Sequence, residues 1–231
     1  MPIKHLPDKL SDFLNFLSSD SQNDERIPPL TVLSKELGVS VASLREQLEV
    51  ARALGWVEVK PRTGIRRLPF SFRPAVEQGL AYAIAVDSNY FKMFADFRKH
   101  VEAAYWYEAV SLLNADDLQN LQALMLRAFD KLQRSPVQIP HLEHRELHLS
   151  IYGKLNNPFV VGILEAYWNL YESVGLDVYT ELHYLQQVWA YHQKMVDSIC
   201  DGNFDAGFQA LTEHMDLINQ RERITPTQIF E

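Results

Sequence analysis

The spacing of apolar side chains divides the first part of the chain into three short helices. Apolar residues recur at helical intervals from residue 8 to residue 18 and predict the first helix. Two more helical stretches follow, at residues 31–38 and 41–54. Gly38 ends the earlier one, and Ser40 stands where an N-cap would start the later one. The predicted order is helix, tight turn, helix.

A strand-like alternation follows these helices directly. Residues 56–60 alternate apolar and polar side chains as a half-buried strand does, residues 61–64 contain the proline and glycine of a turn, and residues 65–68 read as a returning strand. The hairpin has a basic tip, because residues 60–67 hold four lysines or arginines and no acid. We therefore predict a winged helix-turn-helix domain over residues 1–70.

Helical spacing dominates the rest of the chain. Residues 71–76 include a proline and show no clear period, so we expect the connection between two domains there. Seven candidate helices follow, at residues 75–86, 88–112, 115–134, 139–154, 158–173, 177–200 and 203–221. The predicted fold is mainly α, with an antiparallel all-α bundle over residues 77–231 joined to the winged helix.

Composition and charge add the class of protein. Hydrophobic residues make up 47% of the chain and charged residues 23%, as in an ordinary globular protein. The longest apolar run, residues 159–164, is far shorter than the roughly 20 residues of a membrane span. The start of the chain does not read as a secretory signal, and Cys200 is the single cysteine. These features predict a soluble, cytoplasmic protein with no membrane partner.

The charge is unevenly distributed along the chain. The net charge is -8, but residues 1–73 hold eleven basic and nine acidic residues, a balance of +2, while residues 74–231 carry -10. Such an asymmetry is expected if only the first domain meets a polyanion.

Hydroxyl and cationic side chains gather where a helix-turn-helix would meet DNA. The second helix of that motif enters the major groove with its first residues against bases and phosphates, and a basic hairpin adds salt-dependent backbone contacts. The candidate DNA-binding residues are Ser40, Ser43, Arg45, Arg52, Arg62, Gly64 and Arg66. A small helical domain with a solvated, charged hairpin is the alternative that the charge run alone favours. The order of the elements favours duplex DNA.

The winged-helix region resembles GntR-family regulators. The likeness lies in the run from Leu37 to Leu48, in Leu54-Gly55-Trp56-Val57 and in the glycine-containing basic wing, and it covers about residues 8–68. The resemblance implies operator contacts from the start of the recognition helix and from the wing. These map onto Ser40, Ser43, Arg45, Arg62 and Gly64.

Two positions depart from the family pattern. Val41 and Thr31 stand where many members carry arginine. A bidentate arginine contributes about 1–3 kcal/mol of base discrimination, so the chain lacks two contacts on which recognition of the usual operator half-site would depend.

Four histidines in the helical domain are candidate metal ligands. His144 and His148 lie one turn apart on one predicted helix, and His192 and His214 lie on the last two. A bundle could bring the four imidazoles into one interior site. Imidazole suits Zn, Ni, Cu or Fe, and no thiolate narrows the choice. Ordinary packed or surface histidines are the alternative at this point.

The helical domain resembles the FCD ligand-binding domain of the FadR-like branch, over about residues 78–220. The likeness lies in Phe97-Arg98 with Glu102, in the run from His144 to His148, and in His192 and His214. The resemblance implies a divalent metal held by one aspartate and three histidines, with a small carboxylate or other metabolite beside it. The aspartate position here is His144, which removes one negative charge and favours Zn or Ni over hard, oxygen-seeking cations.

Arg98 is the candidate effector-binding residue. A guanidinium holds a carboxylate with two hydrogen bonds, and the resemblance implies an arginine at this position. An ion pair with Glu102, one turn further along the same helix, is the alternative.

These features predict a transcription regulator, expected to be a homodimeric repressor. Its affinity for double-stranded operator DNA would change when an effector, a small carboxylate metabolite, binds next to the metal. Two other functions stay open: a metal-dependent enzyme on a histidine-lined bundle, and a winged helix used for protein contacts.

Overall fold

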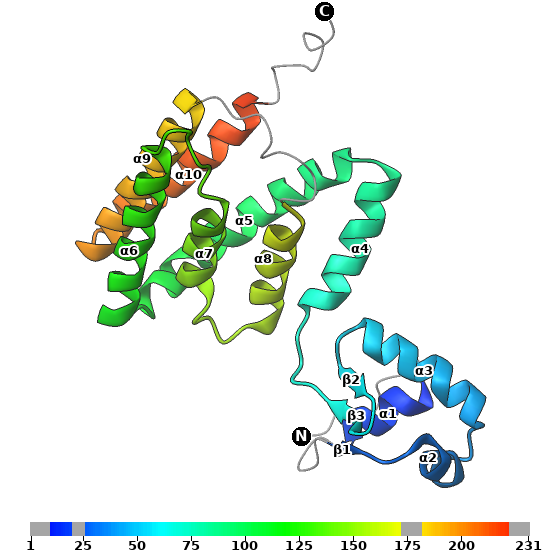
Figure 1. Ribbon diagram of the computed structural model, residues 1–231. Helices are drawn as coiled ribbons and strands as arrows, with labels where there is room; N and C mark the ends of the chain where they lie inside the picture. The colour runs from blue at the N-terminus through cyan, green and yellow to red at the C-terminus, as the bar shows by residue number, and fades with distance from the viewer. Residues whose placement is uncertain (1–9, 20–25, 172–181, 222–231) are drawn as a thin grey trace, which may run out of the picture. The chain divides into compact units, whose positions relative to one another are not determined.

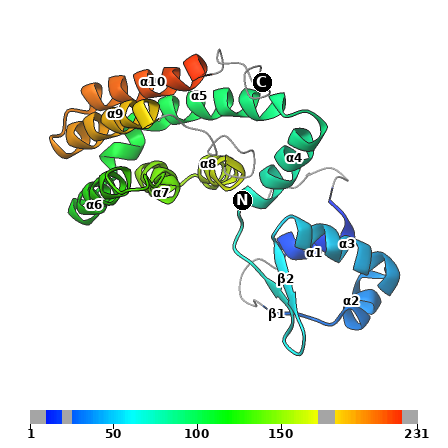
Figure 2. The same cartoon turned by 45° about the horizontal axis from the view of Figure 1, so that its top comes forward.

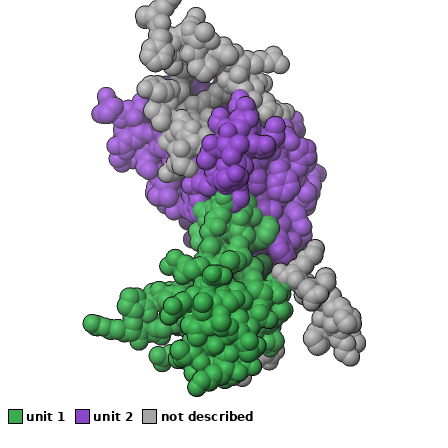
Figure 3. Space-filling model, turned by 90° about the vertical axis from the view of Figure 1, so that its right-hand side faces the viewer, with its two compact units in different colours: residues 1–78 green, residues 79–231 purple. Residues whose placement is uncertain are grey.

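The computed structural model describes residues 10–19, 26–171 and 182–221. The chain divides into two compact units, residues 1–78 and residues 79–231 (Figure 3). The mainly α fold with an N-terminal winged helix is confirmed. Among the described helices, none is long and apolar enough to cross a membrane.

The first unit is a winged helix-turn-helix (Figure 1). Its elements are α1 (Asp12–Ser19), β1 (Arg26–Ile27), α2 (Leu30–Leu37), α3 (Val41–Ala53), β2 (Val57–Lys60) and β3 (Gly64–Arg67). The strands form one antiparallel sheet in the order β1-β3-β2, with Ile27 opposite Ile65 and Val57 opposite Arg67. Strand β1 was not predicted, because two residues show no periodicity and the strand exists only through its pairing with β3.

Apolar side chains from the helices and the sheet form the core of the first unit. Phe13 of α1, Leu33 of α2 and Leu44 of α3 are all fully buried in it. Gly55 carries the chain from α3 into the wing with a φ of +71°, and a Cβ at this position would lie 2.5 Å from Pro74 Cγ. Glycine is therefore required both by the left-handed backbone and by the close approach of the proline.

The second unit holds the remaining described helices. Their bounds are α4 (Arg73–Val86), which starts in the first unit, α5 (Asn89–Ser111), α6 (Ala115–Leu132), α7 (His141–Tyr152), α8 (Pro158–Tyr171), α9 (Leu182–Cys200) and α10 (Phe204–Arg221). Figure 2 shows α5, α9 and α10 in one layer and α6, α7 and α8 in the other. The layers meet through contacts of α5 with α7 and α8 and of α9 with α6.

The core between these layers is large and apolar. Trp106 of α5, Leu121 of α6, Leu147 of α7 and Val196 of α9 are fully buried there. The indole nitrogen of Trp106 donates to the carbonyl of Phe204 at 2.9 Å and ties α5 to the start of α10. A rigid core of this kind holds side chains that project into it in fixed positions.

Some element bounds differ from those predicted. Helix α4 begins at Arg73, inside the 71–76 stretch where we expected the connection. Pro74 is compatible with the first helical turn, because the N–H that proline lacks has no intrahelical acceptor there. The starts expected at residues 8 and 177 lie outside the described residues.

Candidate metal centre and DNA-binding face

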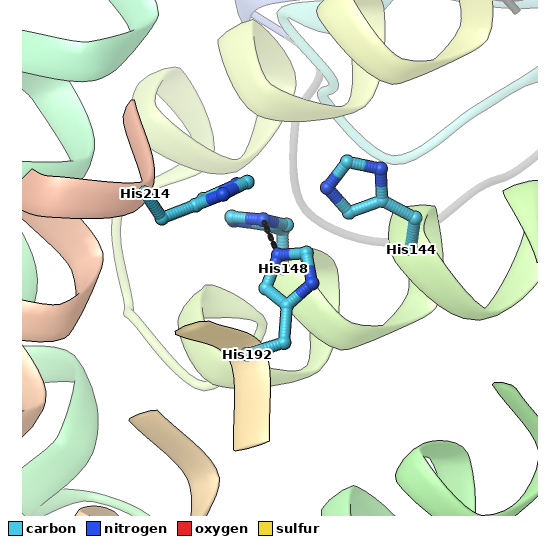
Figure 4. Close-up of side chains that lie close together, drawn as sticks. All are labelled: His144, His148, His192 and His214. Atoms are coloured by element: carbon cyan, nitrogen blue, oxygen red, sulfur yellow. Dashed lines mark hydrogen bonds between the residues drawn. The ribbon is translucent and has the colours of Figure 1, made fainter. Parts of the chain in front are cut away.

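Four histidine side chains from three helices point toward one another inside the second unit (Figure 4). His144 and His148 come from α7, His192 from α9 and His214 from α10. Each offers one ring nitrogen, and these nitrogens all lie within 4.8 Å of one another. The structure therefore brings together all four histidines that the sequence singles out.

Helix geometry explains why these side chains meet. His144 and His148 are four residues apart and project from one face of α7. Helices α9 and α10 lie side by side and are joined by the short turn around Gly202. Because the two helices are antiparallel, His192 and His214 reach a similar level on either side of the turn. Their ring centroids are 4.3 Å apart.

The cluster is shielded from water. His148, His192 and His214 are at most 1% exposed, and His144 is half-buried. Two tryptophans wall the site: the ring of Trp168 lies 4.6 Å from that of His144, and the ring of Trp189 lies 4.8 Å from that of His192. An apolar wall of this kind strengthens electrostatic interactions within the site.

The buried imidazoles are neutral at neutral pH. Burial lowers the pKa of His144, His192 and His214 well below the ordinary 6.5, and repulsion between neighbouring histidines lowers it further. The pKa of His148 is also lowered by burial, an effect that the adjacent Glu102 partly offsets. Neutral imidazole is the form that binds metal ions.

Several ring nitrogens of the cluster lack a partner within the described part of the chain. They are His144 Nε2, His192 Nδ1 and both nitrogens of His214. A buried polar atom without a partner costs about 1–3 kcal/mol, so the arrangement is unfavourable unless something occupies it. The cluster could hold a metal ion, which would supply that partner.

One nitrogen–nitrogen distance in the cluster matches the edge of a zinc site. His148 Nε2 and His192 Nε2 are 3.3 Å apart. A tetrahedral site with metal–nitrogen bonds of about 2.0–2.1 Å has nitrogen–nitrogen edges of about 3.3–3.4 Å. The widest separation in the cluster is longer than such an edge. The most distant ring would therefore move inward on binding.

A buried ion pair adjoins the histidines. Arg98 Nη2 lies 2.6 Å from Glu102 Oε2, both residues are buried, and the guanidinium stacks over Tyr167 at 4.7 Å. Burial alone would raise the pKa of Glu102, but the charge of Arg98 and the contact with His148 outweigh it and lower the pKa to about 2. Glu102 is therefore a carboxylate at any physiological pH.

Glu102 also orients one of the histidines. Its Oε1 lies 3.2 Å from His148 Nδ1, so the carboxylate favours the tautomer with the proton on Nδ1 and an unprotonated Nε2, which is the form that can bind a metal. This role was not predicted, because Glu102 and His148 lie on different helices and their meeting depends on how α5 packs against α7. Arg98 forms the ion pair that was its alternative role. Its role toward an effector stays a prediction.

In the first unit, the predicted DNA-binding residues lie on α3 and the wing. Six of them are exposed: Ser40, Arg45, Arg52, Arg62, Gly64 and Arg66. Ser43 is half-buried, and its backbone N–H donates to Ser40 Oγ at 3.2 Å, which caps the helix. Arg52 lies 2.6 Å from Glu49, so part of its charge is offset on the protein. Their contacts with DNA stay predictions.

Comparison with known proteins identifies the helical unit. The FCD domain family matches residues 94–217, more than half of the chain. The chain belongs to the FCD-domain family. The matched segment contains the four histidines together with Arg98 and Glu102.

Relatives of this FCD protein span both units. The uncharacterized HTH-type transcriptional regulator YieP of Escherichia coli (strain K12) is 24% identical over 193 residues, which cover 80% of each chain. A solved structure of Streptococcus agalactiae GntR matches with a TM-score of 0.62 and 15% identity, over 90% of this chain and 96% of that one. Lar, described as controlling expression of the Listeria monocytogenes agr system, matches with a TM-score of 0.51 and 14% identity, over 93% and 96% of the two chains.

These findings confirm the resemblance to a GntR-family regulator with an FCD domain. The FCD protein is a DNA-binding transcription regulator modulated by an effector, and not an enzyme.

Proposed function

We propose that this FCD protein is a homodimeric, cytoplasmic repressor that binds operator DNA and responds to a small carboxylate held beside a divalent metal ion. The observation that carries the proposal is the set of four neutral imidazoles, three of them fully buried, whose ring nitrogens face one another and in several cases lack a partner among the described residues. Such an arrangement would destabilise a purely structural core, because buried polar atoms without hydrogen-bond partners lower the free energy of unfolding.

The metal in this proposal is Zn or Ni. His144, His148, His192 and His214 would hold it, and their nitrogen donors favour these ions over Mg, Ca or Mn. Glu102 would keep His148 in the ligating tautomer. A bound divalent ion would supply a Lewis-acidic position for an oxygen ligand.

The charge balance supports an anionic effector. Four neutral imidazoles leave the two positive charges of the ion uncompensated, and the nearby carboxylate of Glu102 is already paired with Arg98. A carboxylate ligand would offset part of that charge inside a water-poor site. Arg98 Nε, which has no partner among the described residues, would offer an additional donor.

Regulation requires that the effector distinguish two arrangements of the protein. A ligand that binds both arrangements equally shifts nothing, so the metal site must differ between the DNA-bound and the free forms. The FCD site draws ligands from α7, α9 and α10. A change in its occupancy would therefore alter how these helices pack, and a homodimer would pass that change to two winged helices on a palindromic operator.

The proposal is tested by elemental analysis of the purified, untagged protein. We expect about one equivalent of Zn or Ni per chain, and its loss in His148→Ala. His100→Ala is the matched control, because His100 lies on α5, is exposed and is not part of the cluster. Metal that is retained in His148→Ala, or absent from the wild type after reloading with zinc, would refute the metal site.

A further inference from the structure

The side chain of Gln47 joins two helices of the winged-helix unit. Gln47 lies on α3 and is half-buried. Its Oε1 accepts a hydrogen bond of 2.8 Å from the backbone N–H of Phe13, at the start of α1. Its Nε2 donates a hydrogen bond of 3.2 Å to Ser43 Oγ, one turn earlier on α3. One amide therefore ties the first turn of α1 to the predicted DNA-reading end of α3.

The direction of these hydrogen bonds is fixed by chemistry. A backbone N–H is only a donor, so the amide oxygen of Gln47 must face Phe13. The amide NH₂ group must then face Ser43, and Ser43 Oγ must accept. Among the described residues, Ser43 Oγ donates to no acceptor. Its hydroxyl proton therefore stays available to a group outside the protein.

The backbone N–H of Phe13 stabilises this orientation of the Gln47 amide. The N–H of Phe13 belongs to the first turn of α1, where no helical carbonyl is available to accept it. The ring of Phe13 is fully buried in the core of the unit. Flipping the amide of Gln47 would leave this N–H without an acceptor, which is unfavourable in a packed site.

We propose that Gln47 is a positioning residue that makes Ser43 a hydrogen-bond donor toward DNA. The proposal rests on the proposed reading of operator DNA by α3. A serine hydroxyl that rotates freely can donate or accept, and therefore tolerates every base. Because Gln47 occupies one of the two lone pairs of Ser43 Oγ and leaves its proton free, the hydroxyl is biased toward donating. This bias favours the acceptors guanine O6 or N7, adenine N7 and thymine O4 over cytosine, which presents an amino donor in the major groove.

The chain offers a substitution that reverses this polarity. In Gln47→Glu, a carboxylate oxygen can still accept from Phe13 N–H, but the side chain no longer has an N–H to donate. Ser43 would then donate to the carboxylate, and only its acceptor lone pairs would remain available to DNA. Thermal unfolding should show that Gln47→Glu keeps the stability of the wild type more closely than Gln47→Ala, which also removes the hydrogen bond to Phe13.

The test is selection of random-sequence duplexes by four full-length proteins: wild type, Gln47→Glu, Ser43→Ala and the double variant. We expect the wild type to discriminate against cytosine at one position of the contacted strand in each half-site. The expected discrimination is about twofold to tenfold, the range of one hydrogen bond. It should disappear or reverse in Gln47→Glu and disappear in Ser43→Ala.

The double variant separates polarity from charge. The added carboxylate repels phosphates and weakens binding to all sequences in both the wild-type and the Ser43→Ala backgrounds. A change in base preference should appear only where Ser43 is present. An unchanged base profile in Gln47→Glu would overturn the role of Gln47. If the wild type enriches no sequence, the reading of DNA by this unit is itself refuted.

Discussion

Replacing His192 by alanine should abolish the response of the protein to zinc. His192 is fully buried, its ring lies 4.3 Å from that of His214 and 4.7 Å from that of His144, and its Nε2 lies 3.3 Å from that of His148. The side chain of His192 therefore approaches all three of the other histidines. His192→Ala leaves three imidazoles and removes the nitrogen that sets the tetrahedral edge.

The size of the effect follows from mass action. An ion that binds only the folded form, at a free concentration of 100 times its Kd, stabilises that form by about 2.7 kcal/mol. For a domain of about 150 residues, 1 kcal/mol shifts Tm by roughly 2–4 °C. Zinc should therefore raise the Tm of the wild-type protein by about 5–10 °C. His192→Ala should show almost none of this shift.

The assay is thermal unfolding in EDTA and after titration with zinc. The readout is the difference between the two Tm values for each protein, because the substitution also changes the Tm without metal through the cavity it creates. His100→Ala, at an exposed site on α5, should keep the full shift. A shift of equal size in His192→Ala and in the wild type would refute the assignment of the cluster as a metal site.

Three further predictions concern charge. Glu102→Gln leaves the buried Arg98 without its counter-ion, so urea unfolding should show a decrease of about 3–5 kcal/mol in the free energy of unfolding. Zinc affinity should also fall roughly tenfold to a hundredfold, because His148 loses its orienting carboxylate. Unchanged values would contradict both roles of Glu102. In EDTA, stability should fall as the pH drops below about 6.5, because histidines of the unfolded chain then gain protons while His144, His192 and His214, whose folded pKa values are lowered by burial, do not. If none of the three protonates in the folded state, each costs about 1.4 kcal/mol at pH 5.5, and a flat profile of unfolding free energy between pH 7.5 and 5.5 would argue against neutral, buried imidazoles. Replacing Arg62 or Arg66 by Gln should reduce the slope of log affinity against log salt by about 0.9 for each phosphate that the wing no longer neutralises. The control, Lys194→Gln in the second unit, should leave this slope unchanged. Equal slopes in all variants would show that the wing does not contact the DNA backbone.

The winged helix could be predicted because local signals mark its boundaries. Ser40 caps α3 with its side chain as expected, and Gly55 ends the helix through a backbone that only glycine adopts easily. Strand β1 could not be predicted, since Arg26 and Ile27 become a strand only by pairing with Arg66 and Ile65. Local sequence determines the caps and the hairpin, whereas this pairing depends on the tertiary fold.

The metal site shows the same division. The four-residue spacing of His144 and His148 predicts one face of one helix, and the sequence allows a bundle to bring that face together with His192 and His214, which the structure shows. The contact of Glu102 with His148 has no signal in the sequence, because the two residues are 46 positions apart and meet only through the packing of α5 against α7. The sequence around Arg98 is compatible both with an ion pair and with an effector contact, and the structure shows the ion pair.

The most direct test of the whole account is the affinity of the protein for a duplex that it has selected from a random library. That affinity should be measured in EDTA, with zinc, and with zinc plus a panel of small carboxylates. We predict a change in Kd of at least about fivefold between these conditions for the wild type, the lower end of ordinary allosteric coupling, and no change for His192→Ala. An equal Kd under all conditions in the wild type would contradict the claim that the histidine cluster controls DNA binding.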